Sequence, residues 1–116
     1  MEISSIGIGI DIVKVNRFRI HPYESHKRFY KKLFSKSEID YCLKFKDPYK
    51  HFAGKFAIKE AVIKSISKKM NFIDIKTGHT DSKPTVSLIS KKYRFVVSVS
   101  HEQDTAIAVV ISEKIK

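Results

Sequence analysis

The 116-residue chain has little of what marks several large protein classes. Its single cysteine, Cys42, excludes an internal disulfide framework and a zinc site built from cysteines. Its longest apolar runs, such as residues 106–111, fall far short of the roughly 20 residues of a membrane-spanning helix. No basic stretch precedes an apolar one at the start, so no signal peptide is expected. With no repeat or linker, the chain is predicted to be one cytoplasmic domain over residues 1–116.

Acidic residues are scarce, because 12 Asp and Glu stand against 23 Lys and Arg, for a formal net charge of +11. Residues 14–70 alone carry 16 basic and 5 acidic side chains, so the whole excess lies there. Such a segment suits an acidic partner: nucleic acid, anionic lipid, a phosphorylated cofactor or an acidic protein. A general bias toward lysine explains part of the excess equally well.

The order of patterns along the chain predicts an α+β fold, with an antiparallel sheet packed against one long helix and shorter helices. Residues 6–13 alternate as in a strand with one apolar face and one nearly bare face. Ser35 to Glu38 fits a capping box that opens a short helix. Asp47-Pro48 predicts the start of the long helix, which should run to about residue 69. Further strands are expected at 72–76, 85–89, 95–100 and 106–112, with turns at 77–82 and 101–104.

Asp11 breaks the pattern of the first strand, because aspartate is disfavoured in strands. It shares its face with Gly7 and Gly9, which leave room for something to approach the backbone. One interpretation is a carboxylate held on a rigid strand beside an open floor. The other is an aspartate at the strand end that caps the next turn.

Charged side chains also interrupt the long helix. Glu60 lies at the edge of its apolar stripe, and Lys64 follows one turn later. Taken alone, they are best explained as a surface Glu–Lys pair. Lys55 and Lys59 lie on the apolar side, where a charge is costly without a partner. Together with Asp11, however, Glu60 offers the oxygen ligands that Mg²⁺ prefers, and the lysines suit phosphate, which favours metal-assisted phosphoryl chemistry.

The segment from Ser98 to His101 brings hydroxyls and an imidazole to a strand end. These groups can contact a phosphate, although turn chemistry alone also explains them. The other four histidines show no spacing typical of metal ligands and are expected at the surface.

Four segments resemble the holo-(acyl-carrier-protein) synthases, which are short, single-domain 4′-phosphopantetheinyl transferases. They are Gly7 to Val13, Phe34 to Glu38, Phe52 to Lys64 and Val97 to His101. They occur in the order of that family, and the resemblance covers almost the whole chain. The combination of a Gly-x-Asp strand with the helix of the third segment is far more specific than either part.

This resemblance implies the family's fold and its reaction. The 4′-phosphopantetheine group of coenzyme A is transferred to a serine of apo-acyl carrier protein, adenosine 3′,5′-bisphosphate leaves, and the product supports fatty acid biosynthesis. Asp11 and Glu60 would bind Mg²⁺ with the coenzyme A pyrophosphate, and Lys64 would neutralise the transferring phosphate. Lys59, Ser100 and His101 are expected near the coenzyme A phosphates. Glu60 or a metal-ordered water is the expected base, with Glu38 a weaker candidate.

The resemblance also implies partners. The basic segment after the first strand would dock the acidic carrier protein, with Arg17, Lys27, Arg28 and Phe29 as the candidate contacts. The family forms homotrimers with sites between subunits, so a homotrimer is expected, with no membrane and no nucleic acid as partner. One departure is Ser82, which precedes Lys83-Pro84 where the family pattern has glycine; a turn that needs positive φ would strain it.

Two alternatives remain from the residues. A small nucleic-acid-binding domain would use the positive charge and the aromatic residues interleaved with it between residues 29 and 49. It gives Asp11 and Glu60 no role. A trimeric scaffold without catalysis is the second alternative, although each carboxylate and lysine of the motifs is still in place.

Overall fold

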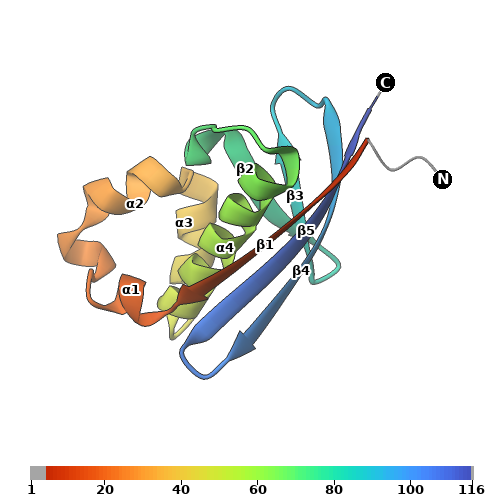
Figure 1. The fold of residues 1–116 in the computed structure, drawn as a ribbon. Helices are drawn as coiled ribbons and strands as arrows, with labels where there is room; N and C mark the ends of the chain where they lie inside the picture. Colours follow the sequence, from red (N-terminus) through yellow and green to blue (C-terminus); the bar gives the residue numbers. More distant parts are fainter. Residues whose placement is uncertain (1–4, 116) are drawn as a thin grey trace.

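A long helix packed against a three-stranded antiparallel sheet forms the centre of the computed structural model, which describes residues 5–115 (Figure 1). The helix is α4 (Pro48–Ile66), and the strands follow the order β1 (Ile6–Lys14), β5 (Thr105–Lys114), β4 (Tyr93–Glu102). A second sheet pairs β2 (Ile75–Thr80) with β3 (Lys83–Leu88). Instead of one sheet, residues 5–115 therefore form two. This refines the predicted α+β fold without changing its class.

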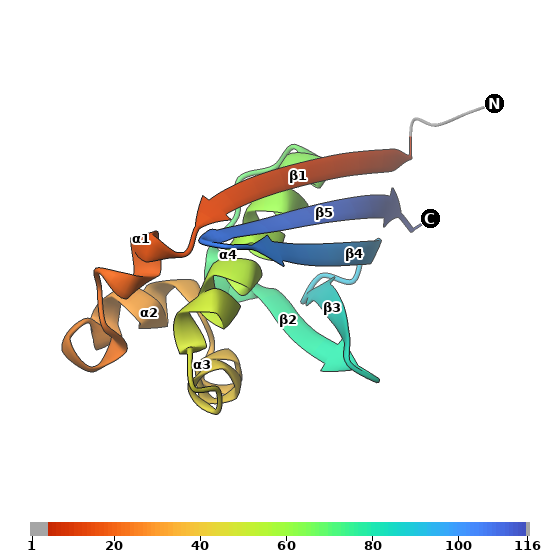
Figure 2. The ribbon, with the colours of Figure 1, turned by 90° about the horizontal axis from the view of Figure 1, so that it is seen from below.

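Short helices fill the segment between β1 and α4 and gather at one end of the molecule (Figure 2). They are α1 (Asn16–Arg19), α2 (Lys27–Leu33) and α3 (Lys36–Leu43), with a 3₁₀ turn at Tyr23–Ser25. A second 3₁₀ turn, Phe72–Asp74, follows α4. Among residues 5–115, none of these helices, nor α4, combines the length and hydropathy needed to cross a membrane.

The bare face of β1 packs directly on α4. A Cβ atom at Gly7 would lie 1.8 Å from the backbone oxygen of Ser65, and one at Gly9 would lie 1.9 Å from that of Ala61. No side chain fits at either position, so the glycines let helix and strand backbones touch. The predicted open floor is therefore wrong: what approaches the backbone here is α4.

Aromatic side chains from α1, α2 and α4 form much of the core. Phe18, Phe34, Phe52 and Tyr30 are fully buried or nearly so, and the Tyr30 hydroxyl donates to the carbonyl oxygens of Phe18 and His21. Phe56 lies edge-on to Phe18, with ring centres 5.5 Å apart. Of the aromatic residues proposed to stack on bases, Tyr30 and Phe34 are therefore interior side chains, whereas Phe45 is 38% exposed. This weakens the support for a nucleic-acid surface.

Both predicted helix starts are confirmed. The Ser35 hydroxyl accepts from the N–H of Glu38, and the Glu38 carboxylate accepts from the N–H of Ser35, so the capping box is complete. The Asp47 carboxylate accepts from the N–H of Tyr49 at 3.3 Å, ahead of a proline in the first turn. This cap is itself held by Arg19, which donates to both Asp47 oxygens at 2.9 and 2.8 Å.

The ends of several elements differ from their predicted positions. Helix α4 stops at Ile66, before the predicted end, because Ser67 has left-handed backbone with φ 55°. Residues 72–74, the start of a predicted strand, are a 3₁₀ turn, and β2 follows at residues 75–80, extending through most of the predicted turn at 77–82. The connection to β3 is only Asp81-Ser82, with φ of 50° and 67°. Primed turns of this kind match the twist of a hairpin, so Ser82 does adopt the conformation that favours glycine.

The apolar face of β1 points away from α4. Ile8, Ile10, Ile12 and Val96 are between 60% and 71% exposed. Strand pairing places Ile111 beside Ile8 and Val109 beside Ile10. The outer face of the three-stranded sheet is therefore apolar and uncovered within residues 5–115, a feature typical of an interaction surface.

Candidate active site

Asp11 and Lys64 meet where α4 crosses β1. The Lys64 ammonium lies 3.2 Å from Asp11 Oδ1 and donates to the carbonyl oxygen of Ile10 at 3.0 Å. The Asp11 side chain is 15% exposed and that of Lys64 53%. Glu60 lies one helical turn before Lys64 on α4, is half-buried, and makes no ion pair within residues 5–115. The structure thus brings Asp11 and Lys64 together, with Glu60 close by along the helix.

These carboxylates fit the chemistry of a magnesium site. Mg²⁺ binds through one or two carboxylates and completes its shell with water and phosphate oxygens. Asp11 uses only one oxygen for Lys64, and its second oxygen has no hydrogen-bond partner within residues 5–115. No group of three or more His, Cys, Asp and Glu side chains in that range is arranged to hold a metal. A metal at Asp11 and Glu60 would therefore need oxygens from a ligand or water.

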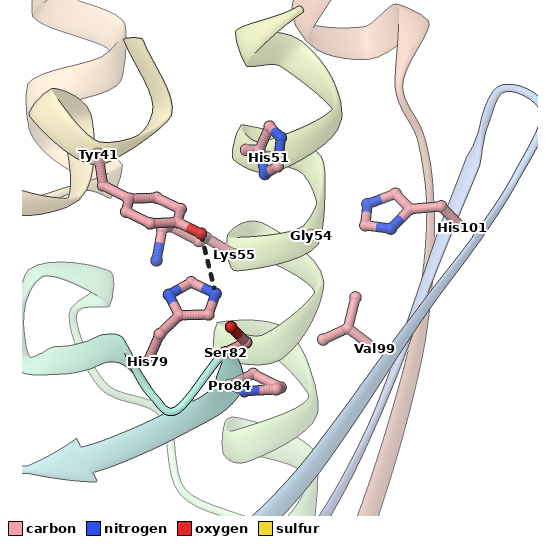
Figure 3. Close-up of a pocket in the computed structure, with 9 residues that line it drawn as sticks. All are labelled: Tyr41, His51, Gly54, Lys55, His79, Ser82, Pro84, Val99 and His101. Carbon is pink, nitrogen blue, oxygen red and sulfur yellow. Dashed lines mark hydrogen bonds between the residues drawn. The ribbon is translucent and has the colours of Figure 1, made fainter. Parts of the chain in front are cut away.

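A cavity of about 410 Å³ lies between α4, the β2–β3 hairpin and β4. Figure 3 shows α4 behind it, Tyr41 and His79 on one side, and His101 and Val99 from β4 on the other. Its volume lies in the range of small-molecule sites. The lining residues are Tyr41, His51, Gly54, Lys55, His79, Ser82, Pro84, Val99 and His101.

Basic side chains dominate this cavity. The Lys55 side chain is only 5% exposed, and its ammonium has no carboxylate partner within residues 5–115. Burial lowers the pKa of Lys55, and burial together with nearby positive charge lowers the pKa of His51 and of His79. His101 Nε2 lies 3.0 Å from the Lys50 carbonyl oxygen, to which it can donate. Because the lowered pKa values favour neutral His51 and His79, the positive charge that this wall offers an anionic ligand comes mainly from Lys55.

His51, His79, Tyr41 and Lys55 were not predicted as site residues. These residues come from three elements, α4, β2 and α3, and meet only in the folded chain. His51 and His79 therefore show no regular spacing in the sequence. The tyrosine stacks on His79 with ring centres 4.5 Å apart. The one available signal was Lys55, a charge on the apolar side of a helix without a visible partner.

Lys59, predicted to contact the phosphates of coenzyme A, lies in the interior and not at a surface that a ligand reaches. It is completely buried and donates to Glu38 Oε1 at 2.8 Å, to the Leu33 carbonyl oxygen at 2.8 Å and to the Phe72 carbonyl oxygen at 3.0 Å. An ammonium has three N–H donors, and all three are used. The expectation that Lys59 contacts coenzyme A phosphates is therefore wrong for this conformation.

The Lys59 partner Glu38 is equally buried, at 2% exposure. Burial by itself raises the pKa of this carboxyl, but hydrogen bonds from Lys59 and Thr77 outweigh it and hold the pKa below its usual range. Its hydrogen bonds go to the capping box, Lys59 and Thr77. These contacts make Glu38 an interior anchor and remove it as a candidate base.

Ser100 and His101 point to opposite sides of β4. Pairing places Ser100 beside Ile107 and His101 beside Ala106, and successive strand residues face opposite ways. His101 lines the cavity with Val99, whereas Ser100 lies on the exposed outer face. Within one chain the structure therefore does not bring Ser100 and His101 together, and a contact of Ser100 with coenzyme A stays a prediction.

The candidate carrier contacts lie on α1 and α2. Arg17 is exposed and places its guanidinium 4.6 Å from the centre of the Phe56 ring. Lys27 and Arg28 are exposed, and Phe29 is half-buried, stacked on His21. The structure leaves these three cations accessible to a partner.

Comparison with known proteins identifies the family of the chain. The model of the 4′-phosphopantetheinyl transferase superfamily matches residues 7–110. The chain belongs to this superfamily. It is 40% identical over 121 residues to the holo-(acyl-carrier-protein) synthase of Clostridium kluyveri, covering 92% of this chain and 89% of the relative. It is 33% identical over 109 residues to that of Thermodesulfovibrio yellowstonii, covering 90% and 96%.

Solved structures of holo-(acyl-carrier-protein) synthases share the fold of this chain. The Helicobacter pylori holo-(acyl-carrier-protein) synthase in complex with coenzyme A is 32% identical and superposes with a TM-score of 0.81, covering 91% of this chain and 99% of that one. The Bacillus anthracis holo-(acyl-carrier-protein) synthase in complex with coenzyme A (3′,5′-ADP) is 28% identical with a TM-score of 0.81, covering 94% of this chain and 96% of that one. The resemblance read from four sequence segments is confirmed, and so is the fold class.

Proposed function

We propose that this protein transfers the 4′-phosphopantetheine group of coenzyme A to a serine of apo-acyl carrier protein and releases adenosine 3′,5′-bisphosphate. The observation that carries the proposal is the pairing of Asp11 on β1 with Lys64 on α4, one turn from Glu60. Relatives at 33% and 40% identity carry the name of this activity. Supply of holo-carrier for fatty acid biosynthesis follows as the role of the product.

The two ends of the site suit an extended phosphorylated substrate. Lys55, in the cavity, and Lys64, beside Asp11, are nine residues apart on α4, which is about 13 Å at 1.5 Å per residue. In this proposal the cavity holds the phosphorylated nucleoside end of coenzyme A against Lys55 and His101. The pyrophosphate then lies toward Lys64.

Asp11 and Glu60 are the residues that would hold Mg²⁺. When bound, the metal supplies positive charge that stabilises the pyrophosphate oxygens during phosphoryl transfer. Lys64, already held at Asp11, supplies a second positive charge at the same place. Glu60 has no ion-pair partner within residues 5–115 and is the available carboxylate for the proton of the attacking serine, directly or through a water.

The carrier protein is proposed to dock on α1 and α2 through Arg17, Lys27 and Arg28, with Phe29 beside them. These helices belong to residues 14–70, where the net positive charge is concentrated. An acidic carrier would be attracted to this surface, with a dependence on ionic strength.

A homotrimer is proposed, with active sites near the subunit interfaces. Its support is the uncovered apolar face of the sheet, which includes Ile8, Ile10, Ile12 and Val96. A trimer would have a mass of about 40 kDa, three times 13.4 kDa, which light scattering on the eluting protein measures. The cytoplasm is the proposed compartment, since Cys42 is a free, buried thiol.

The test is intact-mass spectrometry of apo-acyl carrier protein after incubation with this protein, coenzyme A and Mg²⁺. A gain of one phosphopantetheine mass is expected, and it should disappear with Asp11→Ala and with Glu60→Ala. Asp40→Asn, on the exposed face of α3, is the matched control and should leave the mass gain intact. No mass gain from folded protein with several carriers would overturn the proposal.

A further inference from the structure

A buried polar network joins the interior ion pair to the wall of the cavity. At its centre, Glu38 Oε1 accepts from Lys59 and from the N–H of Ser35. Glu38 Oε2 accepts from the N–H of Thr77 at 2.9 Å and from its hydroxyl. The network thereby ties α3, α4 and β2 together at one carboxylate.

Thr77 connects this carboxylate to Lys55. The Thr77 hydroxyl donates its only proton to Glu38, so its oxygen can act towards other groups only as an acceptor. Lys55 Nζ donates to this same oxygen at 3.0 Å. Because both the backbone N–H and the hydroxyl of Thr77 are bound to Glu38, the threonine is held in one orientation.

The Lys55 ammonium places a positive charge in the wall of the cavity. Lys59 neutralises Glu38, so the network retains the single charge of Lys55. The ammonium lies 4.7 Å from the centre of the Tyr41 ring and beside His79 in the cavity wall (Figure 3). One of its three N–H groups is used by Thr77, which leaves two for a ligand.

We infer that Thr77, held by Glu38, is a positioning residue that fixes the Lys55 ammonium in the cavity so that it binds a phosphate oxygen of the ligand. A lysine has a flexible four-carbon stem and loses much conformational freedom on binding. The bond to Thr77 fixes that stem before the ligand arrives, which increases affinity. This inference rests on the proposed function, in which the cavity holds the nucleotide end of coenzyme A.

The experiment measures the affinity of the protein for adenosine 3′,5′-bisphosphate by calorimetry, together with kcat and KM for coenzyme A. Thr77→Val removes the hydroxyl but keeps the backbone N–H that binds Glu38. It is expected to weaken affinity roughly fivefold, the effect of about one hydrogen bond, and to raise KM by a similar factor while kcat stays within about twofold. Thr77→Ser should restore the wild-type values.

Lys55→Met should weaken affinity more, by roughly 10- to 100-fold, because it removes a charged donor. Adding Thr77→Val to Lys55→Met should cause little further loss, since Thr77 acts only through Lys55. Thr80→Val, on the exposed end of the same strand, is the control and should bind as the wild type does. If Thr77→Val proves poorly folded, Thr77→Ala serves in the same cycle.

Two results would overturn the inference: wild-type affinity in both Thr77→Val and Thr77→Ala, or losses that multiply with that of Lys55→Met. Its failure is separable from failure of the proposed function. In the latter case the wild-type protein itself binds no adenosine 3′,5′-bisphosphate and modifies no carrier.

Discussion

Two carboxylate–lysine pairs of the molecule, Glu38–Lys59 and Asp11–Lys64, share one chemistry and lie in opposite environments. Glu38 and Lys59 are 2% and 0% exposed and lie 2.8 Å apart, with every remaining donor of Lys59 used by a carbonyl oxygen. Asp11 and Lys64 are 15% and 53% exposed and lie 3.2 Å apart. The first pair has its hydrogen bonds satisfied within the chain, and the second has free capacity at the surface.

This difference separates a structural role from a chemical one. A buried ion pair holds elements together but has nothing left to offer a substrate, and losing one partner leaves a buried charge unpaired. An exposed pair adds little to stability but can rearrange around a phosphate and a metal ion. We therefore assign Glu38–Lys59 to the fold and Asp11–Lys64 to the reaction.

The largest expected effect comes from breaking the buried pair. Glu38→Gln leaves the Lys59 ammonium in the interior without its counter-ion and should lower the free energy of unfolding by about 3–5 kcal/mol. Chemical denaturation followed by circular dichroism measures this. Asp40→Asn removes the exposed pair with Lys36 on the same helix and should cost less than about 1 kcal/mol. Equal losses in the two variants would contradict the assignment.

Asp11→Asn should have the reverse profile. It removes a proposed metal ligand and the partner of Lys64, so the rate of phosphopantetheine transfer should fall at least about 100-fold, or about 2.7 kcal/mol of transition-state stabilisation. The free energy of unfolding should change by less than about 1 kcal/mol, because asparagine keeps the size of the side chain and the Lys64 ammonium remains accessible to water. Initial rates from mass spectrometry and one denaturation curve give both numbers. An active variant, or an unfolded one, would argue against the assignment.

A smaller effect is expected from pH. The pKa of Glu38 is lower in the folded chain than its ordinary value of about 4.3, so the folded state favours the ionised form. Its contribution to stability should be complete above that ordinary value and be lost as the pH falls through the lower folded value. The stability difference between wild type and Glu38→Gln should therefore shrink below about pH 4 in denaturation series. A difference that stays constant down to pH 3 would show that the carboxylate charge contributes nothing.

Much of the fold could be predicted from the sequence, because the decisive signals are local. The capping box at Ser35 and the Asp47-Pro48 start of α4 depend on neighbouring residues. The boundaries of β2 could not be predicted, since residues 72–74 are as apolar as a strand and become a 3₁₀ turn through tertiary packing. Nor could the direction of the apolar face of β1, which is decided by the contact of Gly7 and Gly9 with α4.

The site was predictable where motifs lie on regular elements. Asp11, Glu60 and Lys64 were identified because each breaks the local pattern of a strand or a helix. Lys59 breaks its pattern in the same way, and only the fold reveals that Glu38, 21 residues away, satisfies it. The cavity residues His51 and His79 come from separate elements and leave no signal in the sequence.

The measurement that tests the central claim most directly compares Asp11→Asn and Glu38→Gln side by side, with kcat at saturating coenzyme A expressed per folded molecule and the free energy of unfolding of each. We predict that Asp11→Asn loses kcat and keeps its stability, whereas Glu38→Gln loses stability and keeps kcat within about twofold. If Glu38→Gln lost kcat as severely as Asp11→Asn while remaining folded, the buried pair would belong to the reaction, and the division between the two pairs would be wrong.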